Sequence, residues 1–303
     1  MSEHFPRIRV HAQSGYLLIR EGLTLTFYMK RAHSEIAAGV MRSLEAYLRA
    51  VGPSALDSYA DEEGEWMPLD AKGWDLVRSN LLHPKWALEH LADGSSGEER
   101  YRFDYQGKAL DDPSFNWGPD AVSVVSYWLP SEFLEERGPG QLRELALELA
   151  APLPFNSGQV GLTFNCELDL LGVNREVRRY CLRYPGLDVV NPIGISTDIG
   201  TRVRGPSWLT FLGQPVLGEL GGAAGLRSRL HTPGTTVQEL DGDRAVVTLG
   251  PWPEAGDTEQ GKTLPAWREL ARVLEPWTLW GEGTYMLGFQ PEDAPRWERR
   301  FLD

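Results

Sequence analysis

The sequence predicts an α/β protein of the mixed α+β kind, in which a mixed β-sheet is flanked by amphipathic helices. Residues 23–29 alternate between apolar and polar side chains, which is typical of a half-buried strand. Residues 34–51 repeat apolar side chains every three or four positions, which is the spacing of an amphipathic helix. Residues 121–129 are almost all apolar or small, which indicates a strand buried on both faces. These three segments together favour strands and helices that are interleaved along the chain.

Shorter patterns predict the remaining elements. The predicted helices cover residues 71–82, 84–91, 131–151 with a break at 138–140, 264–274 and 293–302. The predicted strands cover 99–105, 158–164 and a hairpin over 235–249, and 93–97 is predicted as a turn. Ser131 is expected to cap its helix, and Asp241-Gly242 is expected to form the hairpin turn.

Residues 108–119 have the composition of a connector and suggest a domain boundary. We therefore expect two halves, 1–115 and 116–303, with one continuous domain as the alternative. A strand, a long helix and a proline stop occur near 23–53 and again near 122–152. The two halves could be related by a degenerate duplication, but we favour the simpler interpretation that α/β proteins commonly repeat such units.

The formal net charge is −13 and the isoelectric point is near 5.0. This charge argues against nucleic-acid binding and against binding to an anionic membrane surface, both of which need clustered cations. It is compatible with simple solubility or with attraction to a basic partner. The two cysteines, Cys166 and Cys181, are too few for a disulfide framework, so we expect free thiols in the cytoplasm. No apolar leader or membrane-spanning run is expected.

The sequence contains no recognisable catalytic constellation. Its six histidines form neither an HExxH motif nor a compact metal cluster. Ser157 does not lie in a GxSxG elbow, and Cys166 has no histidine near it in the sequence. We therefore expect no catalytic residue, no metal, no cofactor and no enzymatic activity.

One motif favours a different interpretation, because residues 256–263 fit the phosphate-binding pattern GxxxxGK[ST]. In such a loop, backbone N–H groups and the lysine, here Lys262, hold the phosphates of a nucleotide. However, Pro251 and Pro253 separate the loop from the preceding strand, and Asp257 and Glu259 would place negative charge beside the phosphates. The simpler interpretation is a polar loop that leads into the helix at 264–274.

Two segments combine acidic residues with a tryptophan. The first contains Asp57, Asp61, Glu62, Glu63 and Glu65 around Trp66. The second contains Glu254, Asp257 and Glu259 around Trp252. Acidic runs usually face water, and a solvated loop is the simpler interpretation of the first segment. The functional interpretation is a contact patch in which carboxylates meet cations of a partner and the tryptophan acts as an aromatic anchor.

Several clusters resemble one family of bacterial immunity proteins that are associated with type VI secretion. The clusters are Val125–Pro130 with Leu134-Glu135, Ala146–Phe155 with Ser157-Gly158, Gly200–Gly205, Trp208–Pro215, Leu220–Gly222 and Arg296–Arg299. Each cluster is weak alone, and they are specific only as a set. The resemblance implies a cytoplasmic protein that binds and neutralises a cognate toxin, in a family whose toxins include nucleases. It carries over no catalytic residue.

We therefore predict a stoichiometric inhibitor whose partner is a toxin with a basic surface. The candidate toxin-binding residues are Asp61, Glu62, Glu63, Glu65, Trp66, Trp252 and Glu254. Two alternatives stay open: an enzyme that binds nucleotide at residues 256–263, and a structural or adaptor protein of the secretion machinery.

Overall fold

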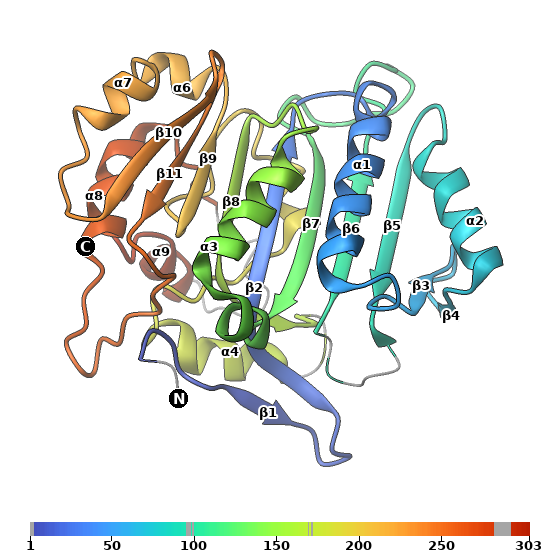
Figure 1. Cartoon of the computed structure of the whole chain (residues 1–303), viewed down its shortest axis with the longest axis horizontal. Coiled ribbons are helices and arrows are strands. Elements are labelled where there is room, and N and C mark those ends of the chain that lie inside the picture. The colour runs from blue at the N-terminus through green and yellow to red at the C-terminus, as the bar shows by residue number, and fades with distance from the viewer. Residues whose placement is uncertain (1–2, 95–97, 99, 169, 171, 282–291) are drawn as a thin grey trace. The chain divides into compact units, whose positions relative to one another are not determined.

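The computed structural model of the chain describes residues 3–94, 98, 100–168, 170, 172–281 and 292–303 (Figure 1). Its internal contacts divide the chain into two compact units. The first unit contains residues 1–24, 156–191 and 201–303, and the second contains residues 25–155 and 192–200. Strand β2 (Leu17–Met29) supplies residues to both units. These bounds differ from the predicted halves 1–115 and 116–303, which stay a prediction about the domains.

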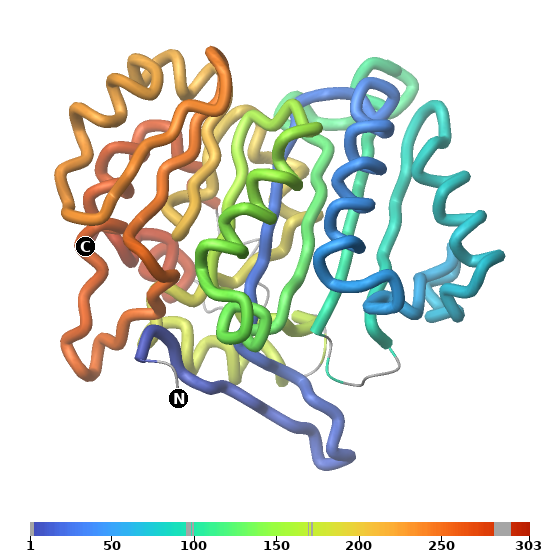
Figure 2. The backbone as a smooth tube through the Cα atoms, viewed as in Figure 1, coloured from blue at the N-terminus to red at the C-terminus, as the bar shows by residue number. Residues whose placement is uncertain are grey.

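The second unit is a β-sheet whose three longer helices lie on one of its faces. After the second half of β2, its strands follow in the order β7 (Ser123–Pro130), β6 (Arg102–Gly107), β5 (Ala87–Ala92), β3 (Ser58–Ala60) and β4 (Trp66–Pro68). Its helices are α1 (His33–Val51), α2 (Ala71–Leu81), α3 (Ser131–Ala150) and the short α5 (Pro192–Ile195). Helices α1, α2 and α3 lie on the same side of the strands (Figure 1). The chain passes from β2 directly into α1 (Figure 2).

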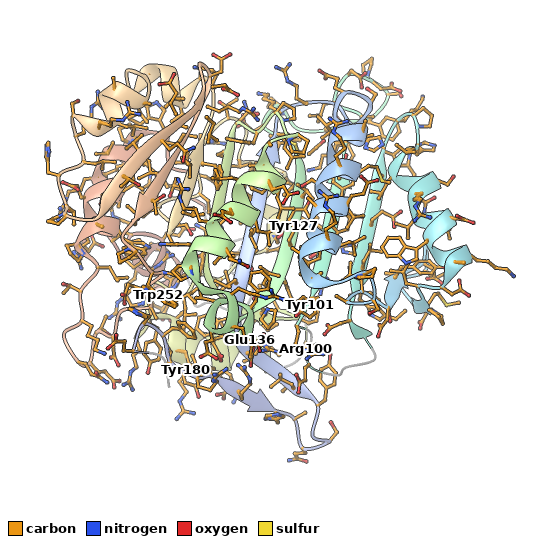
Figure 3. The ribbon with its side chains drawn as sticks, in the orientation of Figure 1. Arg100, Tyr101, Tyr127, Glu136, Tyr180 and Trp252 are labelled. Atoms are coloured by element: carbon orange, nitrogen blue, oxygen red, sulfur yellow. The ribbon has the colours of Figure 1, made fainter. Side chains whose placement is uncertain are left out.

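Buried hydroxyl groups join α1 to its neighbours in this unit. Tyr127 projects from β7 and donates a hydrogen bond of 2.6 Å to Ser43 Oγ of α1 (Figure 3). Ser43 in turn donates to the carbonyl of Leu149 in α3 over 2.9 Å, and Tyr47 donates to the carbonyl of Trp128. Each such bond contributes about 1 kcal/mol to stability, and removal of one partner costs more because the other stays buried. This network fixes how α1 and α3 lie on β7.

The first unit contains the hairpin that the sequence predicts. After the first half of β2, its strands follow in the order β8 (Ser157–Cys166), β9 (Leu209–Leu212), β11 (Arg244–Leu249) and β10 (Thr235–Asp241), and β1 (Arg9–His11) pairs with β2. Its helices are α4 (Val173–Cys181), α6 (Val216–Glu219), α7 (Gly222–Arg227), α8 (Pro265–Leu274), the 3-10 helix η2 (Glu275–Trp277) and α9 (Asp293–Glu298). Every strand pair whose register is described is antiparallel.

The mixed α+β class is confirmed, as are the longer elements. Predicted strand 23–29 lies within β2, helix 34–51 corresponds to α1, strand 121–129 to β7, hairpin 235–249 to β10 and β11, and helix 264–274 to α8. The predicted helix break is present, because Gly138 adopts a φ of 78° inside α3. The two strand–helix repeats, β2–α1 and β7–α3, are neighbours within the second unit.

Four predictions about local structure were wrong. The strand at 23–29 is not half-buried, because every residue from 23 to 29 is buried. The hairpin turn is Gly242-Asp243 and not Asp241-Gly242, because Asp241 still pairs with Arg244. Residues 84–91 do not form a helix, because residues 87–92 form strand β5 and pair with β6. In this strand, Ala87, Glu89 and Leu91 are buried whereas Leu88 is exposed, so the side chains follow a two-residue period. Ser131 is not the helix cap, because it is the first helical residue and Pro130 occupies the N-cap position. The predicted turn 93–97 falls partly outside the described residues.

Among the residues that the structure describes, no helix is both long enough and apolar enough to cross a membrane.

Candidate functional site

The first acidic segment forms the tip of a hairpin between β3 and β4. Strand residue Ala60 pairs with Trp66 across the hairpin, and Tyr59 pairs with Met67. The carboxylate of Asp61 accepts hydrogen bonds from the backbone N–H groups of Glu63 and Glu65, at 3.1 and 2.8 Å. Asp61 therefore shapes the turn, because an aspartate can satisfy backbone donors a few residues further along the chain.

The other acidic residues of this tip are free. Glu62, Glu63 and Glu65 are exposed, and within the described part of the chain their side chains have no hydrogen-bond or ion-pair partner. Trp66 follows them directly and is 48% exposed. An exposed tryptophan beside unpaired carboxylates is the combination expected of a contact surface for a basic partner. We name residues 61–66 the acidic hairpin.

The second acidic segment differs, because its side chains form contacts within the protein. Trp252 stacks on the ring of His4, with ring centroids 4.8 Å apart and planes inclined by 5° (Trp252 is labelled in Figure 3). Glu254 Oε1 lies 2.7 Å from His4 Nδ1. These contacts hold the N-terminal segment in place, so Trp252 and Glu254 are less available to a partner than the acidic hairpin.

The phosphate-binding motif at 256–263 also forms an internally bonded loop. The buried carboxylate of Asp257 accepts hydrogen bonds from the N–H groups of Glu259 and Gln260 and from the guanidinium of Arg183. The backbones of Asp257 and Lys262 bond to each other in both directions. The Arg183 guanidinium lowers the pKa of Asp257. Asp257 therefore occupies backbone donors that a phosphate would need, and the loop is formed as a turn.

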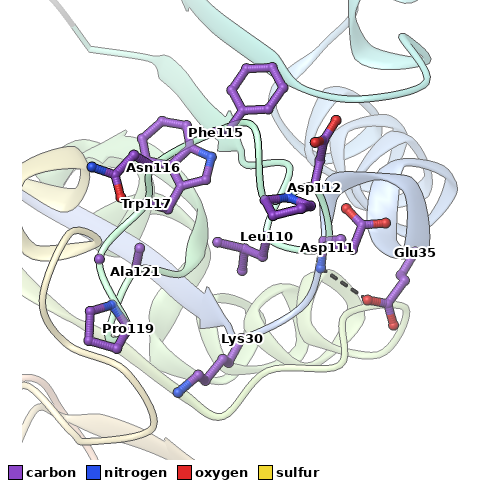
Figure 4. Close-up of a pocket in the computed structure, with 13 residues that line it drawn as sticks. Lys30, Glu35, Leu110, Asp111, Asp112, Phe115, Asn116, Trp117, Pro119 and Ala121 are labelled. Atoms are coloured by element: carbon purple, nitrogen blue, oxygen red, sulfur yellow. Dashed lines mark hydrogen bonds between the residues drawn. The ribbon is translucent and has the colours of Figure 1, made fainter.

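A cavity of about 530 Å³ lies in the second unit between the start of α1 and the loop after β6 (Figure 4). Glu35, Asp111 and Asp112 lie on one side of it, and Trp117 and Pro119 lie on the other. Asp112 accepts hydrogen bonds from Ser114 and, at 3.0 Å, from Lys85, and these hydrogen bonds lower its pKa to about 2. The residues around the cavity include no nucleophile with a neighbouring base.

A buried lysine lies behind the tryptophan of this cavity. Lys108 Nζ donates to the carbonyls of Val122 and Ser196 at 2.8 and 3.0 Å and to Ser196 Oγ at 2.6 Å. It also lies 5.4 Å from the ring centre of Trp117. Burial lowers the pKa of Lys108 to about 8. All three ammonium donors are used, so Lys108 fastens the 192–200 segment to the sheet of its own unit.

The remaining reactive groups are buried and structural. Cys166 and Cys181 are free thiols, and burial raises the pKa of Cys181 to about 12, which disfavours the nucleophilic thiolate. Burial lowers the pKa of His33, whose Nδ1 lies 2.7 Å from the hydroxyl of Tyr105. In the part of the chain that the structure covers, no three His, Cys, Asp or Glu residues could together hold a metal ion.

The sheet of the second unit also carries an ionic network that the sequence did not suggest. Asp104 Oδ1 lies 2.6 Å from His90 Nδ1 and 2.9 Å from Arg102 Nε. Burial raises the pKa of Asp104, but Arg102 and His90 outweigh that effect and the pKa falls. Arg102 also covers the ring of Trp128 at 4.8 Å. Arg102 and Asp104 lie two residues apart on β6, and strand pairing brings His90 to Asp104 and Trp128 to Arg102. The alternation of residues 102–106 is the signal in the sequence for this shared face.

Comparison with known proteins places this chain among the immunity proteins of type VI secretion, because residues 39–301 match a family model of that class. The model is TsiV, described as type VI immunity for VRR-NUC, and the chain belongs to this family. The fold is similar to that of a solved Pseudomonas aeruginosa T6SS protein, PA0821, with a TM-score of 0.79 and 20% sequence identity over 97% of this chain and 87% of that one. No curated protein matches the chain. The predicted family resemblance is thus confirmed.

Proposed function

We propose that this chain neutralises a VRR-NUC nuclease toxin by forming a stoichiometric complex with it in the cytoplasm. The observation that carries the proposal is the match of residues 39–301 to the family of type VI immunity proteins for VRR-NUC. A nuclease must present cations to the phosphates of its substrate. A protein with a net charge of −13 is electrostatically suited to approach such a surface.

The acidic hairpin is proposed to contact the toxin. Its free glutamates, Glu62, Glu63 and Glu65, can pair with toxin cations without breaking an internal ion pair, and Trp66 can be buried as an anchor. Asp61 supports the contact indirectly because it holds the turn. Trp252 and Glu254 stay candidates of lower rank, since a toxin would have to compete with His4 for them.

A titration of nuclease activity tests the function. The purified chain is added in steps to a fixed amount of the VRR-NUC toxin from the same cell, and DNA cleavage is followed. We expect a linear loss of activity that ends at an equimolar ratio, because an inhibitor with a dissociation constant far below the toxin concentration titrates it. Toxin activity that persists at a molar excess of the chain would refute the proposal.

The two alternatives give different results in companion measurements. An enzyme that binds nucleotide at residues 256–263 would bind ATP and lose it on Lys262→Ala, whereas the internally bonded loop predicts no binding. An adaptor of the secretion machinery would co-purify with sheath or baseplate proteins and would leave DNA cleavage unchanged.

A further inference from the structure

The face of the second unit's sheet that points away from α2 is partly bare. Strand register defines this face: Ala60 opposes Trp66, and Leu88 and His90 lie opposite Gln106 and Asp104. The other face belongs to α2, because Gly73 of α2 approaches the ring of Tyr59 and the pair Tyr59–Leu91 lies under that helix. Since side chains alternate along a strand, Trp66, Leu88 and His90 project from the face opposite α2.

The segment that covers this face does not extend over β5. Over β6 and β7 it is covered by the 192–200 segment, where Ser196 Oγ contacts Gln106 at 3.3 Å. Beyond that point Leu88 is 46% exposed on β5 and Trp66 is 48% exposed on β4. Both are large apolar side chains, and apolar area left open on a sheet face is characteristic of an interaction surface.

The charges around this bare face favour a basic partner. The free glutamates of the acidic hairpin border it at the Trp66 end. The cations nearby are already paired, Arg102 with Asp104 and Arg100 with Asp93. A surface with an apolar centre, unpaired carboxylates at its rim and neutralised cations complements a basic protein surface.

We infer that the VRR-NUC toxin docks on this bare face of strands β4, β3 and β5, with Trp66 and Leu88 in the buried centre and the glutamates of the acidic hairpin, Glu62, Glu63 and Glu65, at the rim. This inference rests on the proposed function and specifies its surface. The inference also places the solvent-exposed side of α2 outside the interface. Leu76 on that side is 44% exposed, nearly the same as Leu88, and therefore offers a matched control.

The test compares Leu88→Arg with Leu76→Arg, together with Trp66→Ala, in binding to an inactivated VRR-NUC toxin by calorimetry. Arg at position 88 would place a bulky cation against a basic partner, so we expect affinity to fall ~100-fold or more. Trp66→Ala should weaken binding ~10- to 100-fold as the loss of an aromatic anchor. Leu76→Arg should stay within ~3-fold of the wild type, because surface changes outside an interface have small effects.

Folding is checked for each variant by circular dichroism and thermal unfolding. If Leu88→Arg does not fold, Leu88→Ser replaces it and should weaken binding while Leu76→Ser does not. If the wild-type chain binds the toxin and the variants at 66 and 88 bind as tightly, the docking face is wrong while the immunity function stands. If the wild-type chain does not bind the toxin, both proposals fall.

Discussion

Glu89 is a buried carboxyl group that should make the stability of this protein depend on pH. It lies on β5 on the face that α2 covers, it is 2% exposed, and its Oε1 has no hydrogen-bond partner among the described residues. Burial raises the pKa of Glu89 to about 7, and the side chains of Asn80 and His90 offset only part of this effect. The perturbation is Glu89→Gln, which keeps the shape and removes the titration.

The sign and size of the pH effect follow from the difference between the folded and the unfolded pKa of Glu89. The folded protein holds the proton of Glu89 more tightly than the unfolded chain, whose carboxyl has the ordinary pKa of 4.5. The stability that this group contributes is therefore complete below about pH 4.5 and is lost as the pH rises through about 7. A shift of about 2.5 pKa units corresponds to about 3 kcal/mol, of which about 2.5 kcal/mol is lost between about pH 5 and pH 8.

The assay is urea unfolding of the wild type and Glu89→Gln, followed by circular dichroism at about pH 5 and pH 8. Other groups titrate in both proteins and cancel in the difference. We expect Glu89→Gln to gain about 1–3 kcal/mol relative to the wild type between the two pH values. Glu45→Gln, at an exposed position on α1, should show no such gain. An equal difference between Glu89→Gln and the wild type at both pH values would refute the reasoning.

Three further predictions concern other parts of the fold. Gly107→Ala should destabilise the protein by about 2–4 kcal/mol in thermal unfolding, because its Cβ would lie 2.2 Å from His33 Nδ1 and 2.3 Å from the Tyr105 hydroxyl. Gly140→Ala, where nothing lies within 4 Å, should be neutral or slightly stabilising. Between about pH 7 and pH 9.5, the stability of the wild type should rise by about 2 kcal/mol relative to that of Lys108→Met. The reason is that the folded pKa of Lys108 is about 8 and the unfolded chain holds the proton more tightly. Equal pH profiles of the two proteins in urea unfolding would contradict this. Lys262→Ala should leave toxin inhibition and the unfolding midpoint unchanged, since Lys262 is exposed, whereas Asp257→Ala should lower the midpoint by removing the carboxylate that holds the loop.

The sequence was most informative where one periodic pattern ran over many residues. Helix α1 and strand β7 were predicted from apolar spacing alone, because the residues on a buried face are mostly apolar. The hairpin of β10 and β11 was predicted from Asp241-Gly242, although its two turn residues are Gly242 and Asp243 and Asp241 still pairs with Arg244. The same logic failed for residues 84–91, where a short apolar run fits a helix or a strand equally well and the partner strand β6 decided the outcome.

What the sequence determined by itself was the fold class, the long elements, the acidic character and the family. Tertiary structure decided which candidate contacts are available. Two tryptophans with acidic neighbours are alike in the sequence, but His4 packs against Trp252 from 248 positions away, while Trp66 lies on a terminal strand with little to cover it. Likewise, Leu88 is exposed because β5 pairs with β6 and α5 does not extend over β5. Exposure of a side chain depends on what distant segments place above it, and no local pattern records that.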